Sequence, residues 1–355
     1  MPASKVATAS TLTLLSAVLL AAQQPAPPHP PAGSKTPGAS RAQQPWPDDA
    51  RGRIRVRTEL VVVPVTVKDS SGNAVLDLAR TDFRILEDGV EQEIEVFSSD
   101  PFPLSAVLLI DNSLEQKAAE QVQKTMTAVA GGLSAADEAA IMLFDEQTAA
   151  PSEWFNDTDK LYDQLKRTEL DGQFSVRAGG PMTSGPRINA QPQAGGVPPS
   201  PARSGRSSKR LDDAVFAAAM HLRQAPRDHR KIVFLISDGA NSKGNKVTFD
   251  DAVRALLSAD ISVYAIGVGD AHLSRGINAL ARYAHSTGGD VFYAGRRGSL
   301  EGLYARVTEQ ARNQYTLAYA PNRGGPSRDF HDIEVRVRRR SVTVLARQGY
   351  YSPTL

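Results

Sequence analysis

The chain has 355 residues, a net charge of +2 and no cysteine. The lack of cysteine excludes disulfides, zinc-thiolate centres and cysteine nucleophiles, and the small net charge gives no support to binding of nucleic acid or an acidic membrane surface. Hydrophobic residues make up 41% and charged residues 23%, which is typical of a soluble globular protein with room for one large domain or two moderate ones.

The first 24 residues have the layout of a secretory signal peptide, because Lys5 precedes an apolar run from Leu12 to Ala22 that ends in small residues. A membrane-spanning helix needs roughly 20 apolar residues, so this run predicts a cleaved leader instead of an anchor. We therefore expect a secreted protein of the periplasm or cell envelope, with no membrane span after cleavage. Residues 25–52 are rich in Pro, Ala and Gln and predict a disordered linker.

Two segments far apart in the sequence have the texture of antiparallel strands. In residues 53–100, the β-branched run LVVVPVTVK (60–68) is followed by FRILEDGVEQEIEVF (83–97), whose Asp-Gly pair is a strong hairpin signal. Residues 314–355 contain QYTLAYAP and the alternating HDIEVRV. Either segment alone would be marginal in size, so we expect the two to pair into one β-sandwich.

Between these segments, residues 101–313 alternate continuous apolar strands with amphipathic helices. This pattern predicts an α/β domain with a doubly wound, mostly parallel sheet covered on both faces. Residues 175–207 interrupt it with six Gly, six Pro and no acidic residue, and they predict a disordered basic loop. The expected strands are 104–110, 139–144, 231–237 and 261–268, and the expected helices are 115–131, 157–167, 211–223, 248–259, 274–285 and 299–313.

Acidic and hydroxyl side chains follow two of the predicted parallel strands. Asp111 ends the first strand and is followed by Ser113 and Glu115, while Asp238 lies in SDGAN (237–241) after a later strand. Because ligands bind at the carboxyl ends of strands in such sheets, we expect these groups to converge. Hard oxygens suit Mg²⁺ or Mn²⁺. Two other interpretations stay open, a hydrolase that uses Asp111 and Glu115 as paired carboxylates and polar strand ends with no binding role.

These motifs resemble a von Willebrand factor type A domain, which has Asp-x-Ser-x-Ser after the first strand, a Thr on a later loop, and an Asp in Ser-Asp-Gly. The flanking β segments are similar to those of the secreted bacterial VWFA-related family, over roughly residues 56–352. The resemblance implies a dinucleotide-binding-like α/β fold, no catalysis, and ligand binding through a metal-ion-dependent adhesion site.

The sequence departs from that adhesion-site pattern at two positions. Glu115 replaces the second Ser, and alignment on Asp213-Ala214 puts Lys209 at the Thr position, with Ser207 and Ser208 as the nearest hydroxyls. An ammonium group cannot ligate a metal, but beside carboxylates it can replace one.

Two hypotheses for the site follow. In the first, Mg²⁺ or Mn²⁺ is bound by Asp111, Ser113, Glu115 and Asp238, with Ser208 as a further possible ligand. In the second, the cation of Lys209 or Arg210 neutralises Asp111 and Asp238, and the domain binds its partner without metal.

The motifs of common enzyme classes are missing from the sequence, which has no GxSxG, no HExxH and no GxxxxGK[ST]. We therefore predict a non-enzymatic protein that mediates protein–protein interaction or adhesion at the cell envelope through a degenerate adhesion site. A metal-free envelope scaffold is the alternative, and a carboxylate-pair hydrolase is the alternative of another class. The expected partner is a protein or an anionic envelope polymer, towards which the basic 175–210 segment would steer, and not nucleic acid.

Overall fold

The computed structural model describes residues 60–148, 150–172, 209–274, 279–294, 299–321 and 329–352. The predicted signal peptide (1–24), linker (25–52) and basic loop (175–207) lie outside the described residues, as does Ser208. Within the described ranges, no helix is both long enough and apolar enough to cross a membrane.

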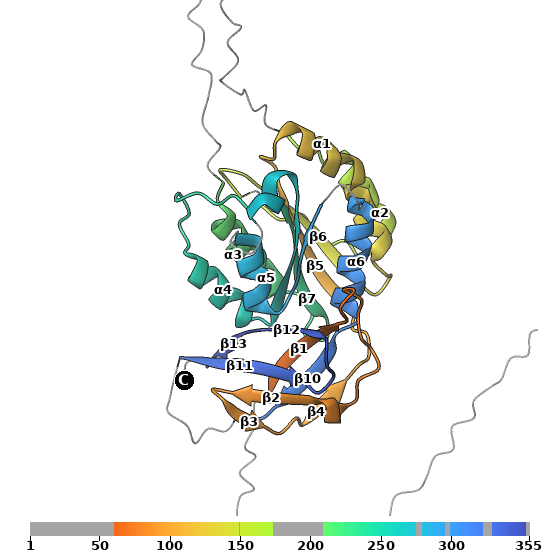
Figure 1. The fold of residues 1–355 in the computed structure, drawn as a ribbon. Helices are drawn as coiled ribbons and strands as arrows, with labels where there is room; N and C mark the ends of the chain where they lie inside the picture. The colour runs from red at the N-terminus through yellow and green to blue at the C-terminus, as the bar shows by residue number, and fades with distance from the viewer. Residues whose placement is uncertain are drawn as a thin grey trace, which may run out of the picture. The chain divides into compact units, whose positions relative to one another are not determined.

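Five strands form the central sheet of the α/β domain, and every neighbouring pair is parallel (Figure 1). The spatial order is β6-β5-β7-β8-β9. The strands are nearly continuous runs of apolar residues because helices bury both faces of the sheet. Their bounds are β5 Leu104–Asp111, β6 Glu138–Phe144, β7 Arg230–Ser237, β8 Ile261–Gly267 and β9 Val291–Tyr293.

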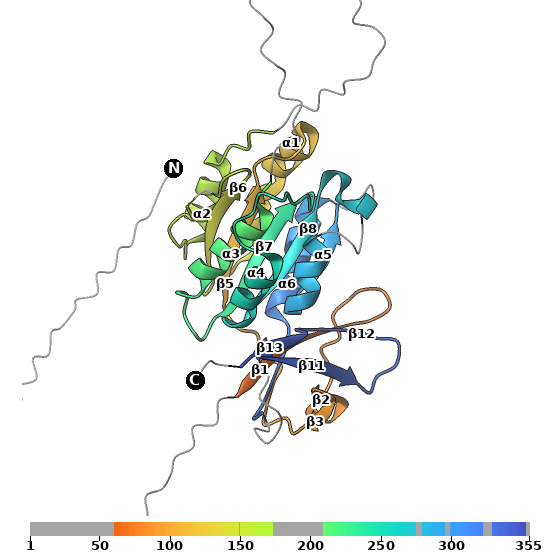
Figure 2. The same cartoon turned by 90° about the vertical axis from the view of Figure 1, so that its left-hand side faces the viewer.

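Helices cover the two faces of this sheet as two separate layers (Figures 1 and 2). Alternate residues of β5 point to opposite faces, so Leu108 and Ile110 belong to one core cluster and Val107 and Leu109 to the other. The first layer contains α1 (Gln116–Thr125), α2 (Thr158–Arg167) and α6 (Leu300–Arg312). The second contains α3 (Leu211–Leu222), α4 (Phe249–Leu257) and α5 (Ala279–Thr287).

The order in which the chain adds strands to the sheet reverses at β5, and this switch point determines where a ligand can bind. After β5 the chain forms β6 on one side, and it then returns to form β7 on the other side of β5. The crevice of an open α/β sheet lies at such a switch point, outside the carboxyl ends of the two strands. Those ends carry Asp111 on β5 and, directly after β7, Asp238.

The β-sandwich consists of two four-stranded antiparallel sheets with the orders β12-β1-β10-β4 and β13-β11-β2-β3. Both sheets combine strands of the two segments, because β1 pairs with β10 and β12 in the first sheet, and β2 pairs with β11 in the second. The segments alternate in the first sheet, whereas in the second the pair β13-β11 lies beside the pair β2-β3. The strands are β1 Val61–Lys68, β2 Phe83–Glu87, β3 Val90–Gln92, β4 Val96–Ser98, β10 Tyr315–Tyr319, β11 Phe330–Val337, β12 Thr343–Ala346 and β13 Gly349–Tyr351.

The core of the sandwich follows from period-2 alternation along these strands. Val61, Val63, Val65 and Val67 of β1 all point inward and are at most 7% exposed. The opposite sheet contributes Ile85 and its neighbours to the same cluster. The predicted fold class, a doubly wound parallel sheet with a β-sandwich built from both flanking segments, is therefore confirmed. The exact domain boundaries at residues 100 and 313 stay predictions.

Three local predictions differ from the structure. The helix expected at 115–131 ends at Thr125, whose hydroxyl donates to the Gln121 carbonyl, and a 3-10 helix, η3 (Met126–Gly132), follows it. Strand β4 leaves the predicted 83–97 hairpin and pairs with β10 in the other sheet. The short strand β9 is not predicted, because three residues give no usable periodicity.

Side chains connect the sandwich to the α/β domain at several points. Lys68 Nζ lies 2.6 Å from Asp290 Oδ2, and Arg347 Nη1 lies 2.6 Å from Asp260 Oδ1. The buried guanidinium of Arg230 donates to the carbonyls of residues 311, 312 and 314, where α6 leads into β10. Because burial opposes its charge, the pKa of Arg230 falls to about 10.

Asp137 anchors the start of the sheet with a fully buried carboxylate. It accepts hydrogen bonds from the backbone of Leu104 and Ser134 and lies 2.6 Å from Arg312 Nη2. Burial alone would raise the pKa of Asp137, but the Arg312 guanidinium and the backbone donors outweigh burial and hold this pKa below the usual range of an aspartate. The ionised form therefore stabilises the folded state.

We expect Asp137→Asn to lower the free energy of unfolding at neutral pH by about 3 kcal/mol, because Arg312 loses its buried counter-charge. The folded-state pKa is depressed, so the stabilisation is complete above the unfolded pKa and is lost as pH falls through the folded one. The difference between wild type and variant should thus shrink in acid. Urea unfolding over a pH series measures it, and a pH-independent difference would contradict it. Exposed Asp100→Asn is the control and should cost less than about 0.5 kcal/mol.

Candidate functional site at the carboxyl edge of the sheet

We call the carboxyl edge of the parallel sheet, where β5 and β7 end, the rim. Asp111 lies at its centre and is buried, with none of its surface exposed. Its Oδ1 accepts hydrogen bonds from the Ser113 backbone N–H at 2.9 Å and the Ser113 hydroxyl at 2.8 Å. Its Oδ2 accepts from the Ser237 hydroxyl at 2.7 Å and from Lys209 Nζ at 2.9 Å. A carboxylate offers about four acceptor positions, so these four donors saturate Asp111.

Lys209 brings the two predicted acids together. Its Nζ lies 2.9 Å from Asp111 Oδ2 and 2.7 Å from Asp238 Oδ2, and its side chain is only 7% exposed. The backbone around it is fixed, since the Lys209 carbonyl accepts from Ser242 N–H and the following N–H donates to the Asp145 carbonyl. The ammonium therefore holds a defined position between the carboxyl ends of β5 and β7.

The donor set at this position does not fit a divalent cation while Lys209 occupies it. Mg²⁺ requires an octahedron of oxygen ligands at about 2.0–2.1 Å, but every acceptor position of Asp111 is already used and an ammonium group repels a second cation. Asp238 also accepts from the Ala240 N–H through its Oδ1. A metal could bind here only if Lys209 moved away.

The remaining predicted ligands lie at different depths. Ser113 is 5% exposed and is bonded to Asp111 as described above. Glu115 is exposed and is the N-cap of α1, where its backbone carbonyl accepts from the N–H groups of Ala118 and Ala119. The carboxylates of Asp111, Glu115 and Asp238 are not all within 4.8 Å of one another. The fifth motif position is therefore exposed, whereas Asp111 and Ser113 are buried.

A second polar layer, which the sequence interpretation did not include, supports the loop after β7. Asp212, 7% exposed on the first turn of α3, accepts from the Tyr283 hydroxyl at 2.7 Å and the Asn241 side-chain amide at 2.8 Å. Burial and the neighbouring carboxylate both raise the pKa of Tyr283. Asp213 Oδ1 accepts from two further backbone N–H groups of the same loop, those of Lys246 and Val247.

This layer explains why Asp238 has a fixed direction. The loop turns sharply at Gly239, whose φ of +78° is unfavourable for other residues, and the two aspartates at the start of α3 hold its far end. The sequence shows only the Ser-Asp-Gly turn at 237–239 and, separately, the two acids at the start of α3. The partner Tyr283 comes from α5, and neither spacing nor composition indicates it.

Residues 202–306 match the model of the von Willebrand factor type A domain. A search of curated protein sequences found no match. The chain carries a von Willebrand factor type A domain, an assignment that rests on this match and on the α/β fold. The matched range begins after Asp111, so β5 and β6 join the domain through the parallel sheet that they form with β7.

Several solved structures are similar in part. A von Willebrand factor type A protein from Catenulispora acidiphila is 8% identical with a TM-score of 0.41, over 83% of this chain and 74% of that one. The conserved hypothetical protein BatB from Bacteroides thetaiotaomicron is 13% identical with a TM-score of 0.39, over 59% and 98%. The manganese-loaded TRAP protein from Plasmodium vivax is 12% identical with a TM-score of 0.39, over 77% and 100%.

Proposed function

We propose that this chain is an exported, non-enzymatic interaction protein of the cell envelope that binds a protein partner at the rim around Asp111, without a bound metal ion. The observation that carries the proposal is the position of Lys209 Nζ between Asp111 and Asp238. An internal cation there supplies the positive charge that two converging carboxylates need. The amino-terminal leader pattern supports export, and a type A domain supports an interaction role.

The rim is better suited to binding than to catalysis. Asp111 is fully buried and saturated with donors, so it has no position from which to reach a substrate proton. A carboxylate-pair hydrolase needs two carboxylates that flank one reacting bond, and the fully buried Asp111 is not available as one of them. An open metal position for a partner's carboxylate also does not fit while Lys209 is in place. The partner would then be recognised by hydrogen bonds and charges of the surface groups around Asp238.

Affinity capture with the immobilised chain and envelope extract tests this proposal. We expect the same partner protein to be retained in the presence of Mg²⁺ and in the presence of a chelator. Glu115→Lys reverses a surface charge at the rim and should reduce the retained partner at least tenfold. Glu309→Lys is the matched control, because it reverses an exposed charge near the carboxyl end of α6. That end of α6 lies at the edge of the sheet opposite the rim, so this variant should retain the partner. Capture that requires Mg²⁺, or that is unaffected by Glu115→Lys, would contradict the proposal.

A further inference from the structure

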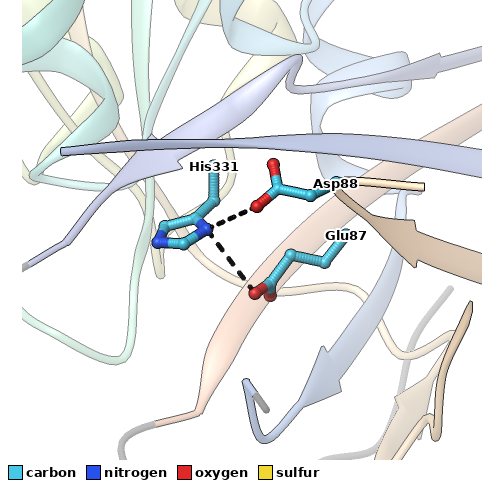
Figure 3. A group of neighbouring side chains, drawn as sticks. All are labelled: Glu87, Asp88 and His331. Atoms are coloured by element: carbon cyan, nitrogen blue, oxygen red, sulfur yellow. Dashed lines mark hydrogen bonds and ion pairs between the residues drawn. The ribbon is translucent and has the colours of Figure 1, made fainter. Parts of the chain in front are cut away.

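A second cluster of metal-binding side chains lies in the β-sandwich. Glu87 ends β2, Asp88 opens the turn into β3, and His331 belongs to β11 (Figure 3). One ligand atom from each side chain lies within 4.8 Å of the other two. Among the residues that the structure describes, no other three His, Asp or Glu side chains form such a group.

Strand pairing fixes the positions of the three residues. Asp88 and Gly89 have φ values of +48° and +84°, as the two central residues of a type I′ hairpin turn require. Asp88 N–H donates to the Asp332 carbonyl, and Asp332 N–H donates to Asp88 Oδ1, each at 3.0 Å. These bonds direct Asp88 Oδ2 at His331 Nδ1, at 2.9 Å. The cluster is therefore held by backbone geometry and not by flexible side chains alone.

Glu87 is a buried carboxylate with long contacts to Tyr350 and His331. Its side chain is 7% exposed, the Tyr350 hydroxyl lies 3.4 Å away, and His331 Nδ1 lies 3.7 Å away. Tyr319 on the opposite sheet is fully buried, and its hydroxyl interacts with Glu87. Placing a carboxylate in such a site is costly unless a cation or strong hydrogen bonds compensate it. The arrangement is that of a group that accepts a cation, with hydroxyls behind it to orient it.

The distances are also those of a metal site. Ligand atoms around a tetrahedral Zn²⁺ lie about 3.4 Å apart when the metal–ligand bonds are 2.0–2.1 Å long. His331 Nδ1 is 2.9 Å from Asp88 Oδ2 and 3.7 Å from Glu87 Oε1, so these separations lie on either side of that value. The imidazole stacks on Tyr350 at 5.2 Å, which fixes the plane of the ring. The side chains of His331 and Asp88 are 15% and 24% exposed, which gives an ion access from solvent.

We propose that Glu87, Asp88 and His331 bind one divalent transition-metal ion where β2 ends beside the start of β11, with Zn²⁺ as the expected ion. One imidazole and two carboxylates suit Zn²⁺ better than Mg²⁺ or Ca²⁺, which prefer oxygen ligands alone. The ion would connect the β2–β3 turn to β11 and would place a cation beside Glu87. This site is separate from the rim of the α/β domain, and it is independent of how the rim binds its partner.

Calorimetric titration of the metal-free full chain with Zn²⁺ tests the proposal. We expect one saturable site. Asp88→Asn should weaken its affinity at least about tenfold, and it keeps the turn because Asn-Gly is a preferred type I′ pair. His331→Gln should abolish binding. At the same concentration, Zn²⁺ should also raise the melting temperature of the wild type more than that of Asp88→Asn, which decides the matter even if His331→Gln does not fold.

Two controls separate this site from other ways of holding Zn²⁺. His285→Gln removes an exposed histidine on α5, and Asp238→Asn removes a rim carboxylate, and both should bind Zn²⁺ like the wild type. If titration of the wild type with Zn²⁺ gives no saturable heat signal, the proposal is overturned and the cluster is only an ion pair between His331 and Asp88. Unchanged affinity in Asp88→Asn and His331→Gln would overturn it as well.

Discussion

In the variant Lys209→Met we expect the free energy of unfolding to fall by about 3 to 5 kcal/mol, measured by urea unfolding in the presence of a chelator. The substitution keeps an unbranched side chain of similar length but removes the ammonium group. Asp111 would then be a carboxylate with no exposed surface and no cationic partner, and Asp238 would face it without the shared counter-charge. Removing one member of a buried ion pair costs more than the pair itself contributes, because the remaining charge stays desolvated.

Lys243→Met is the matched control for this experiment. Lys243 lies in the loop after β7, close in sequence to the ion pair, but it is exposed, so its removal should change stability by less than about 0.5 kcal/mol. A second variant, Lys209→Thr, places a hydroxyl where the adhesion-site pattern has one. We expect added Mg²⁺ to restore stability in Lys209→Thr and to have no such effect on the wild type. Equal stability of Lys209→Met and Lys243→Met would contradict the role assigned to the ammonium.

Arg230→Met is expected to cost about 3 kcal/mol or more in the same measurement. Its guanidinium donates to the Ala311 carbonyl at 2.7 Å, to the carbonyls of Arg312 and Gln314, and to the Thr316 hydroxyl. Without it, carbonyls at the end of α6 lose their donors inside the protein, at roughly 1–3 kcal/mol for each group that stays unsatisfied. The positive charge at the carboxyl end of the helix dipole is lost as well.

The control for Arg230 is Arg227→Met, which removes an exposed arginine three residues earlier. We expect it to change the free energy of unfolding by less than about 0.5 kcal/mol. Because Arg230 also contacts Thr316 in β10, its loss should destabilise the sandwich and the α/β domain together. An Arg230→Met protein as stable as Arg227→Met would show that water replaces the guanidinium at these carbonyls.

The rim could be located from the sequence because its two acids end buried strands. Four continuous apolar runs fix the strands, and the carboxyl ends of neighbouring parallel strands must meet at one edge, so Asp111 and Asp238 were expected together. Lys209 could be named as a candidate because it stands where the adhesion-site pattern has a hydroxyl. Its contacts with both carboxylates depend on the path of the chain before α3, which no local pattern encodes.

Other parts of the structure could not be predicted because their partners are distant in the sequence. Tyr283 reaches Asp212 across 71 residues, and His331 reaches Asp88 across 243. The Asp88-Gly89 pair predicted a hairpin correctly, but nothing in a hairpin signal tells which strand lies beside it. The early end of α1 and the sheet change of β4 are likewise decided by packing, which overrides local propensity.

The interleaving of strands in the sandwich constrains the order in which the chain can fold. Val61 pairs with Tyr319, so on a ribosome the first strands emerge long before their neighbours exist. Closing so long a loop in an unfolded chain is slow, and unpaired apolar strands are exposed to aggregation meanwhile. Prior folding of the intervening α/β domain shortens the effective loop, because β5 begins and α6 ends at the same edge of the parallel sheet. The sandwich can close only after β10 to β13 have been synthesised, because both of its sheets contain strands from the carboxyl-terminal segment.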